Sequence, residues 1–111
     1  DGSKPLVCAQ SRGFDCSGEG CDEATPQAMN VPDILRVDLK AKTLSALDPE
    51  LADESMTIAS GESPQGRLVL HGSEGDRGWS LAIDVASGDS VLTVNDPKIG
   101  IVVFGECGDD R

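Results

Sequence analysis

The fold class of this 111-residue chain is decided by one stretch, Trp79-Ser80-Leu81-Ala82-Ile83-Asp84-Val85-Ala86-Ser87-Gly88-Asp89-Ser90-Val91-Leu92-Thr93-Val94. Its first half alternates apolar residues with small or polar ones, which is typical of a β-strand with one buried face. The residues that we expect to face inward are Trp79, Leu81, Ile83 and Val85. Residues 86–89 predict a hairpin turn in which Gly88 takes a positive φ, and residues 90–94 then pair back.

Further short strands follow at near-regular spacing on both sides of this hairpin. The segments with strand character are 35–40, 43–47, 56–58, 67–71 and 99–106. Their connections are expected to be turns at 40–42 and 61–66, one helical turn at 48–53 and a glycine-rich loop at 72–78. Such a series predicts one all-β domain over residues 1–111, an antiparallel meander that closes into a small barrel or a curled sheet.

The last strand differs from the others because it is apolar on both faces. Residues 99–104 read Ile-Gly-Ile-Val-Val-Phe, without the polar alternation of residues 79–85. A strand of this kind is normally covered on both sides. We therefore expect the last strand either to be covered on both faces or to close the sheet.

Four cysteines allow three pairings, and their spacing favours one of them. Cys16 and Cys21 flank Ser-Gly-Glu-Gly, which is flexible enough to close a small loop. Cys8 lies in one apolar run and Cys107 follows another, as expected for two paired terminal strands. We predict Cys8–Cys107 and Cys16–Cys21 bridges, the second holding a long loop at 9–32. The alternative is a zinc site with His71, which the single tight cysteine pair disfavours.

Two disulfides would place the protein in the periplasm or make it secreted. The chain begins at Asp1 without an initiator methionine, as expected after removal of a signal peptide. Its most apolar stretch, residues 99–104, is far shorter than the ~20 residues needed to span a bilayer, so no membrane insertion is expected.

The net charge of the chain limits the classes of partner that it is expected to bind. The formal net charge is −11, which argues against nucleic acids and anionic membranes and favours a basic protein or a cation. The acids at 15, 19, 22 and 23 crowd around the second bridge, but they do not follow an EF-hand pattern. The acids at 74 and 76 share another loop. Calcium binding at either group of acids and plain solvated charge stay open as alternatives. The oligomeric state is not predicted, and no cofactor is predicted.

Catalytic patterns are lacking, and we predict that the protein is not an enzyme. Ser80 lacks the second glycine of a nucleophile elbow, and His71 falls on the outward face of its strand. Loops on a rigid β-scaffold commonly carry binding. The loop residues that we predict to bind a partner are Ser73, Glu74, Asp76, Arg77, Ser87, Gly88 and Asp89.

Several segments resemble small exported disulfide-containing β-proteins of proteobacteria, a family of unknown function. They are Pro32-Asp33-Ile34-Leu35-Arg36-Val37-Asp38, Leu68-Val69-Leu70-His71-Gly72, Trp79-Ser80-Leu81-Ala82-Ile83-Asp84 and Val103-Phe104-Gly105-Glu106-Cys107. The Ser-Gly segments at 59–62 and 86–90 also resemble those of the membrane-bound inhibitors of c-type lysozyme, small disulfide-closed β-barrels of the periplasm. This likeness implies inhibition of a basic partner such as lysozyme. The alternatives are a small-ligand carrier with a lipocalin-like barrel and a structural protein of the cell envelope.

Overall fold

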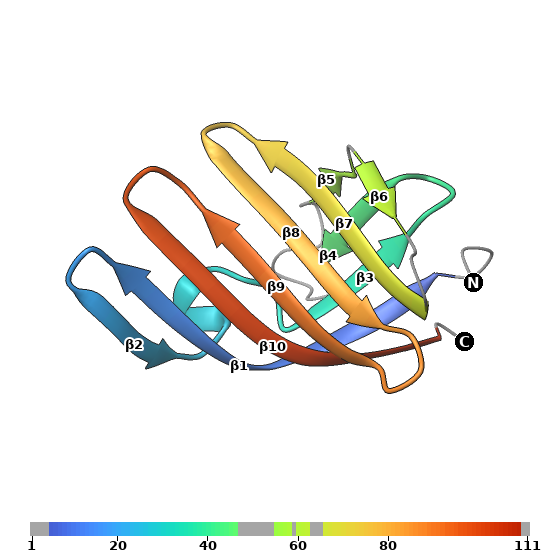
Figure 1. Cartoon of the computed structure of the whole chain (residues 1–111), viewed down its shortest axis with the longest axis horizontal. Coiled ribbons are helices and arrows are strands. Elements are labelled where there is room, and N and C mark those ends of the chain that lie inside the picture. The colour runs from blue at the N-terminus through green and yellow to red at the C-terminus, as the bar shows by residue number, and fades with distance from the viewer. Residues whose placement is uncertain (1–4, 47–54, 59, 63–65, 110–111) are drawn as a thin grey trace.

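The computed structural model of the chain describes residues 5–46, 55–58, 60–62 and 66–109, which form one strongly curled β-sheet (Figure 1). The strands are β1 (Leu6–Ser17), β2 (Gly20–Ala24), β3 (Ile34–Asp38), β4 (Thr43–Ala46), β5 (Ser55–Thr57), β6 (Ser60–Glu62), β7 (Arg67–Glu74), β8 (Arg77–Asp84), β9 (Asp89–Asn95) and β10 (Ile99–Asp109). A short 3-10 helix, η1 (Gln27–Met29), follows β2.

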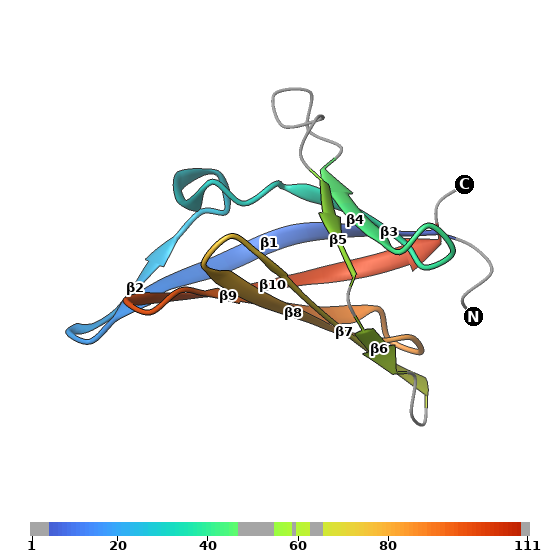
Figure 2. The same ribbon diagram turned by 90° about the horizontal axis from the view of Figure 1, so that it is seen from above.

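All the pairings are antiparallel, and the strands follow the order β5-β4-β3-β1-β10-β9-β8-β7-β6, with β2 attached to β1. Strand β1 joins two series of hairpins, because it pairs with β10 on one side and with β3 on the other. The two ends of this sheet, β5 and β6, are separated in the chain only by residues 58 and 59. Three residue steps span at most about 10 Å, so the sheet curls until its ends come close together (Figure 2). The predicted antiparallel, curled all-β sheet is confirmed.

Among the described residues, alternation of side chains along the strands builds most of one core on the inner face of the curl, and residues of η1 and the connections complete it. The core residues are Cys8, Met29, Val31, Leu35, Val37, Leu44, Ile58, Leu68, Leu70, Trp79, Leu81, Ile83, Leu92, Ile101 and Val103. The cross-strand register aligns them in rows, such as Leu70, Leu81, Leu92 and Val103 across β7, β8, β9 and β10. The inward prediction for Val85 is wrong. Its side chain is 47% exposed because β8 ends at Asp84 and Val85 starts the turn.

Both disulfides have the predicted partners. Cys8 and Cys107 lie directly opposite each other on the terminal strands β1 and β10, and Cys8 is fully buried. Cys16 and Cys21 lie directly opposite each other on β1 and β2. The expected long loop at 9–32 is wrong, because β1 continues to Ser17 and forms a hairpin with β2. The second bridge therefore clamps a β-hairpin rather than a loop.

The glycine-rich segment at 72–78 also differs from the predicted loop. Strand β7 runs to Glu74 and β8 begins at Arg77, so only Gly75 and Asp76 form the turn. Gly75 has a φ of 64°, which glycine adopts without strain. Gly72 lies opposite Trp79, and a Cβ on it would be only 2.5 Å from the indole nitrogen. The glycine at 72 thus serves close packing of Trp79 and not chain flexibility.

The predicted turn at 61–66 is wrong for its first two residues, because residues 61 and 62 belong to β6. Residues 63–65 and the predicted helical turn at 48–53 lie outside the described residues.

Candidate functional site

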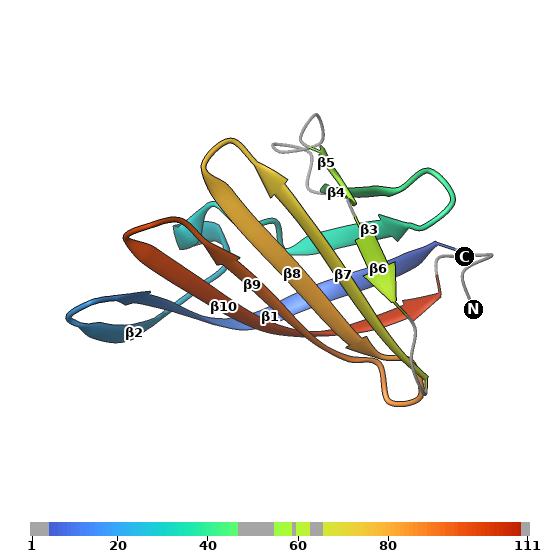
Figure 3. The same ribbon diagram turned by 45° about the horizontal axis from the view of Figure 1, so that its top comes forward.

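The two predicted binding loops lie at opposite ends of strand β8. The β7–β8 turn precedes β8 and the β8–β9 turn follows it (Figure 3). Strand β8 has 8 residues, and at about 3.3 Å a residue the two turns are roughly 26 Å apart. They therefore do not form one contiguous site.

Most of the predicted residues around the β7–β8 turn belong to strands. Ser73 and Glu74 lie in β7 and Arg77 in β8, which leaves Asp76 in the turn itself. Near this turn, the pKa of Asp96 in the neighbouring β9–β10 turn is lowered, chiefly by two backbone N–H groups and to a smaller extent by the charge of Arg77. The main causes of the lowered pKa are the backbone N–H groups of residues 98 and 99, which donate to the Asp96 carboxylate at 2.7 and 2.9 Å.

The β8–β9 turn is fixed against the last strand. Gly88 has a φ of 86°, which confirms the predicted positive value. Its N–H donates to the carbonyl of Asp84, and its carbonyl accepts from the N–H of Cys107, both at 2.7 Å. The hydroxyl of Ser87 accepts a hydrogen bond from the N–H of Asp89. Ser87 and Gly88 thus have clear structural roles, which position Asp89 at the start of β9.

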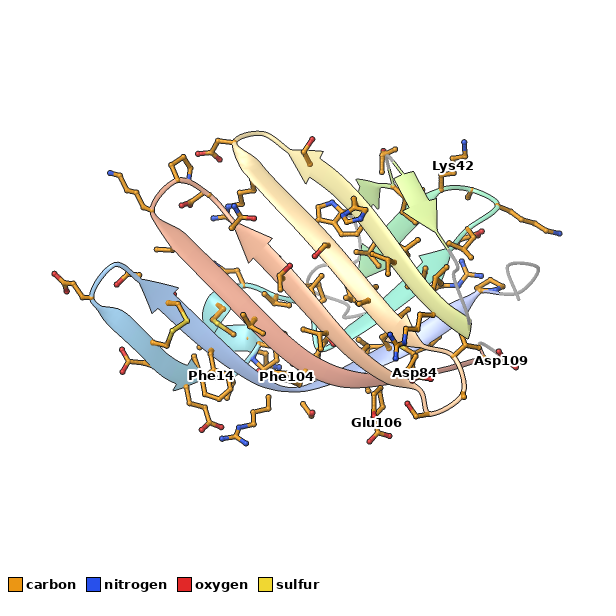
Figure 4. The ribbon with its side chains drawn as sticks, in the orientation of Figure 1. Phe14, Lys42, Asp84, Phe104, Glu106 and Asp109 are labelled. Carbon is orange, nitrogen blue, oxygen red and sulfur yellow. A yellow bond between two sulfur atoms is a disulfide. The ribbon has the colours of Figure 1, made fainter. Side chains whose placement is uncertain are left out.

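Sequence reasoning missed an apolar patch on the outer face of the sheet. We define the outer patch as Phe14, Ala82, Val91, Val102 and Phe104. One register row places Phe104, Val91 and Ala82 next to one another across β10, β9 and β8. Phe14 lies opposite Val102, and its ring meets that of Phe104 edge to face at 6.3 Å between centroids (Figure 4).

Charged side chains border this outer patch on two sides. Glu106 and Asp89 are directly opposed on β10 and β9, two residues along from the Phe104–Val91 pair and on the same face, and both are exposed. Like charges at opposed positions destabilise a sheet. On the other side, the guanidinium of Arg12 lies 5.2 Å from the centre of the Phe14 ring and forms an ion pair with Glu23 at 3.0 Å. The charge of Arg12 is therefore balanced within the protein.

The register also brings His71 opposite Ser80 on the outer face. His71 is exposed, and the Ser80 hydroxyl lies 2.6 Å from that of Thr93, at hydrogen-bonding distance. Within the described ranges, no group of three or more His, Cys, Asp or Glu residues is placed to hold a metal ion. The described part of the chain also contains no helix that is long and apolar enough to cross a membrane.

Comparisons of the chain with protein-family models, with curated proteins and with solved structures found no match.

One feature of the sequence indicated the outer patch, namely that residues 99–104 are apolar on both faces of the strand. The inner face of this strand is buried through Ile101 and Val103, as predicted. Of the two alternatives expected for this strand, cover on both faces is wrong for the outer face, where Phe104 is 42% exposed. The reason is topological, because every described strand belongs to the same curled sheet and none crosses its outer surface. Instead, the strand joins the first strand to the later hairpins, because it pairs with β1 and with β9.

Proposed function

We propose that this protein is an exported, non-catalytic binding module that recruits a cationic partner protein in the periplasm or outside the cell. The observation that carries the proposal is the excess of acidic over basic residues, 20 against 9, combined with opposed carboxylates on a rigid sheet. Besides Asp89 and Glu106, Asp15 and Asp22 are paired across β1 and β2. Such pairs cost folding stability, whereas a cationic partner would benefit from them.

Two disulfides fit a non-reducing environment, and they support the exported location. A rigid scaffold also lowers the entropic cost of binding, because few groups have to be ordered when the partner arrives. The interior favours this function over that of a small-ligand carrier. Trp79, Leu81, Ile83 and Val103 all belong to one buried cluster in the space where a carrier would hold its ligand.

Inhibition of a c-type lysozyme is the specific form of this function that the sequence resemblance favours. The Ser-Gly segment at 86–90 spans the end of the β8–β9 turn and the first two residues of β9, with Asp89 and Glu106 exposed there. These carboxylates would attract a basic enzyme.

The proposal is tested by calorimetric titration with two basic proteins, c-type lysozyme and cytochrome c. Binding is expected at an ionic strength of about 0.01 M and should weaken strongly at about 1 M, where the Debye length falls from about 30 Å to about 3 Å. Lysozyme with acetylated lysines is the matched control, because it keeps the fold of the probe and loses much of its positive charge. Absence of binding at low ionic strength, or equal binding of acetylated lysozyme, would overturn the proposal. A lysozyme activity assay then separates an inhibitor from a binder without inhibition.

A further inference from the structure

We propose that the partner docks on the outer patch, with Phe14 and Phe104 as apolar anchors and the Asp89–Glu106 pair as the site for a cationic side chain. This inference rests on the proposed function, and it moves the contact from the hairpin turns to the outer face of β1, β9 and β10.

The placement of the aromatic residues supports this docking surface. The chain contains Trp79 and two phenylalanines, and both phenylalanines lie on the outer face rather than in the core. Phe104 is the more exposed of the two, and its ring contacts Phe14 from the neighbouring strand. Aromatic side chains are enriched at the centres of protein interfaces and depleted from ordinary exposed surface. The pair therefore marks a surface that a partner covers.

The rigidity of the strands that carry the patch also favours docking there. Strand β10 is paired on both sides, with β1 and with β9, over most of its length. Phe14 lies on the β1–β2 hairpin, which the Cys16–Cys21 bridge clamps two residues further along β1. The patch is thus presented in one conformation before binding, which favours affinity. This clamp also gives the second disulfide a role in binding.

The charge of this surface identifies the class of protein that would occupy it. No ion pair joins Asp89 or Glu106 to a basic side chain within the part of the chain that the structure describes. A second copy of this chain would bring the same carboxylates and a further charge of −11, and an anionic membrane would also be repelled. A cationic protein complements the surface. Because successive residues on one face are about 7 Å apart, its lysine or arginine should lie about 7 Å from the apolar group that covers Phe104.

The experiment compares the dissociation constant of c-type lysozyme for the wild type and for matched pairs of variants, by calorimetry. Truncation of both anchors, Phe14→Ala with Phe104→Ala, is expected to raise the constant by about tenfold or more. The control Val85→Ala removes an equally exposed apolar side chain from a turn and should change it by less than about twofold. Circular dichroism verifies that each variant is folded.

The contribution of the Asp89 and Glu106 carboxylates is tested by the same comparison of dissociation constants. Asp89→Asn with Glu106→Gln should weaken binding and flatten its salt dependence. Asp76→Asn with Glu19→Gln removes the same charge from two hairpin turns and should have the smaller effect.

The possible outcomes distinguish failure of the docking proposal from failure of the proposed function. Binding that survives loss of both phenylalanines but falls with Asp76→Asn and Glu19→Gln overturns the docking face and leaves the proposed function standing. Absence of wild-type binding overturns both. Self-association of the wild type in sedimentation, abolished by Phe104→Ala, would make a second copy the occupant and overturn the docking proposal.

Discussion

Loss of the Cys8–Cys107 bridge is expected to destabilise the protein by about 4–5 kcal/mol, because this bridge restricts the unfolded chain over almost its whole length. The two cysteines are separated by 99 residues, and the chain-entropy relation gives about 4.7 kcal/mol for a loop of roughly 100 residues. The Cys16–Cys21 bridge closes a separation of only 5 residues, for which the same relation gives about 2 kcal/mol. The difference between the two bridges is therefore about 2–3 kcal/mol.

Packing increases the expected difference. Cys8 is fully buried among core residues, whereas Cys21 is exposed and Cys16 is half-buried. Replacing Cys8 with alanine leaves a small void in the core, which adds to the loss. A domain of this size is typically stable by about 5–15 kcal/mol, so the variant without the long bridge should be close to unfolding.

The assay is urea denaturation of two double variants, Cys8→Ala with Cys107→Ala and Cys16→Ala with Cys21→Ala, each followed by Trp79 fluorescence. The first should have the much lower free energy of unfolding. Equal losses, or a larger loss for the short bridge, would refute the conclusion that the terminal bridge is the main covalent support of the fold.

Three further predictions concern single residues. Gly72→Ala should destabilise the protein by about 1–3 kcal/mol and alter Trp79 fluorescence, because the new Cβ would overlap the indole; an unchanged melting temperature would contradict this packing. Ser90→Ala should raise the free energy of unfolding by about 1 kcal/mol in urea denaturation, because the buried hydroxyl has no hydrogen-bond partner in the described part of the chain. A decrease of the same size would contradict this prediction and show that the hydroxyl does have a hydrogen-bond partner. The pKa of Asp96 should lie below the usual aspartate range in an NMR titration. Because the pKa is lower in the folded state than in the unfolded state, the Asp96 carboxylate stabilises the fold at pH values above the unfolded-state pKa. This stabilisation disappears as the pH falls through the folded-state pKa. The variant Asp96→Asn should flatten the acid limb of the stability profile, and a normal pKa at Asp96 would contradict the hydrogen bonds from Lys98 and its neighbour.

Local patterns in the sequence were sufficient to predict most of the sheet. The alternation at Leu81 and Ile83 identified the buried face of β8, because a half-buried strand imposes a period of two. The positive φ of Gly88 followed from turn chemistry. The pairing of Cys8 with Cys107 followed from their positions in apolar terminal segments. Each of these features depends on residues that are close in sequence or on a strong covalent constraint.

The remaining features depend on long-range packing, which local patterns do not record. Residues 15–24 lack an alternation of large apolar side chains, and their hairpin is set by the Cys16–Cys21 bridge and by the pairing of β1 with β10. Gly72 looked like a loop residue because its reason for being small, the indole of Trp79, lies on another strand. The outer patch was missed because its members come from β1, β8, β9 and β10. Only the register of the sheet places Phe14 beside Phe104.

The central claim, that a cationic partner docks on the outer patch, is tested most directly by NMR. Amide shifts of the isotope-labelled protein are followed during titration with c-type lysozyme. We predict that the largest changes occur in three segments that surround the outer patch, residues 12–14, 89–91 and 102–106. Changes confined to the hairpin turns at 18–19, 75–76 and 96–98 would contradict the claim.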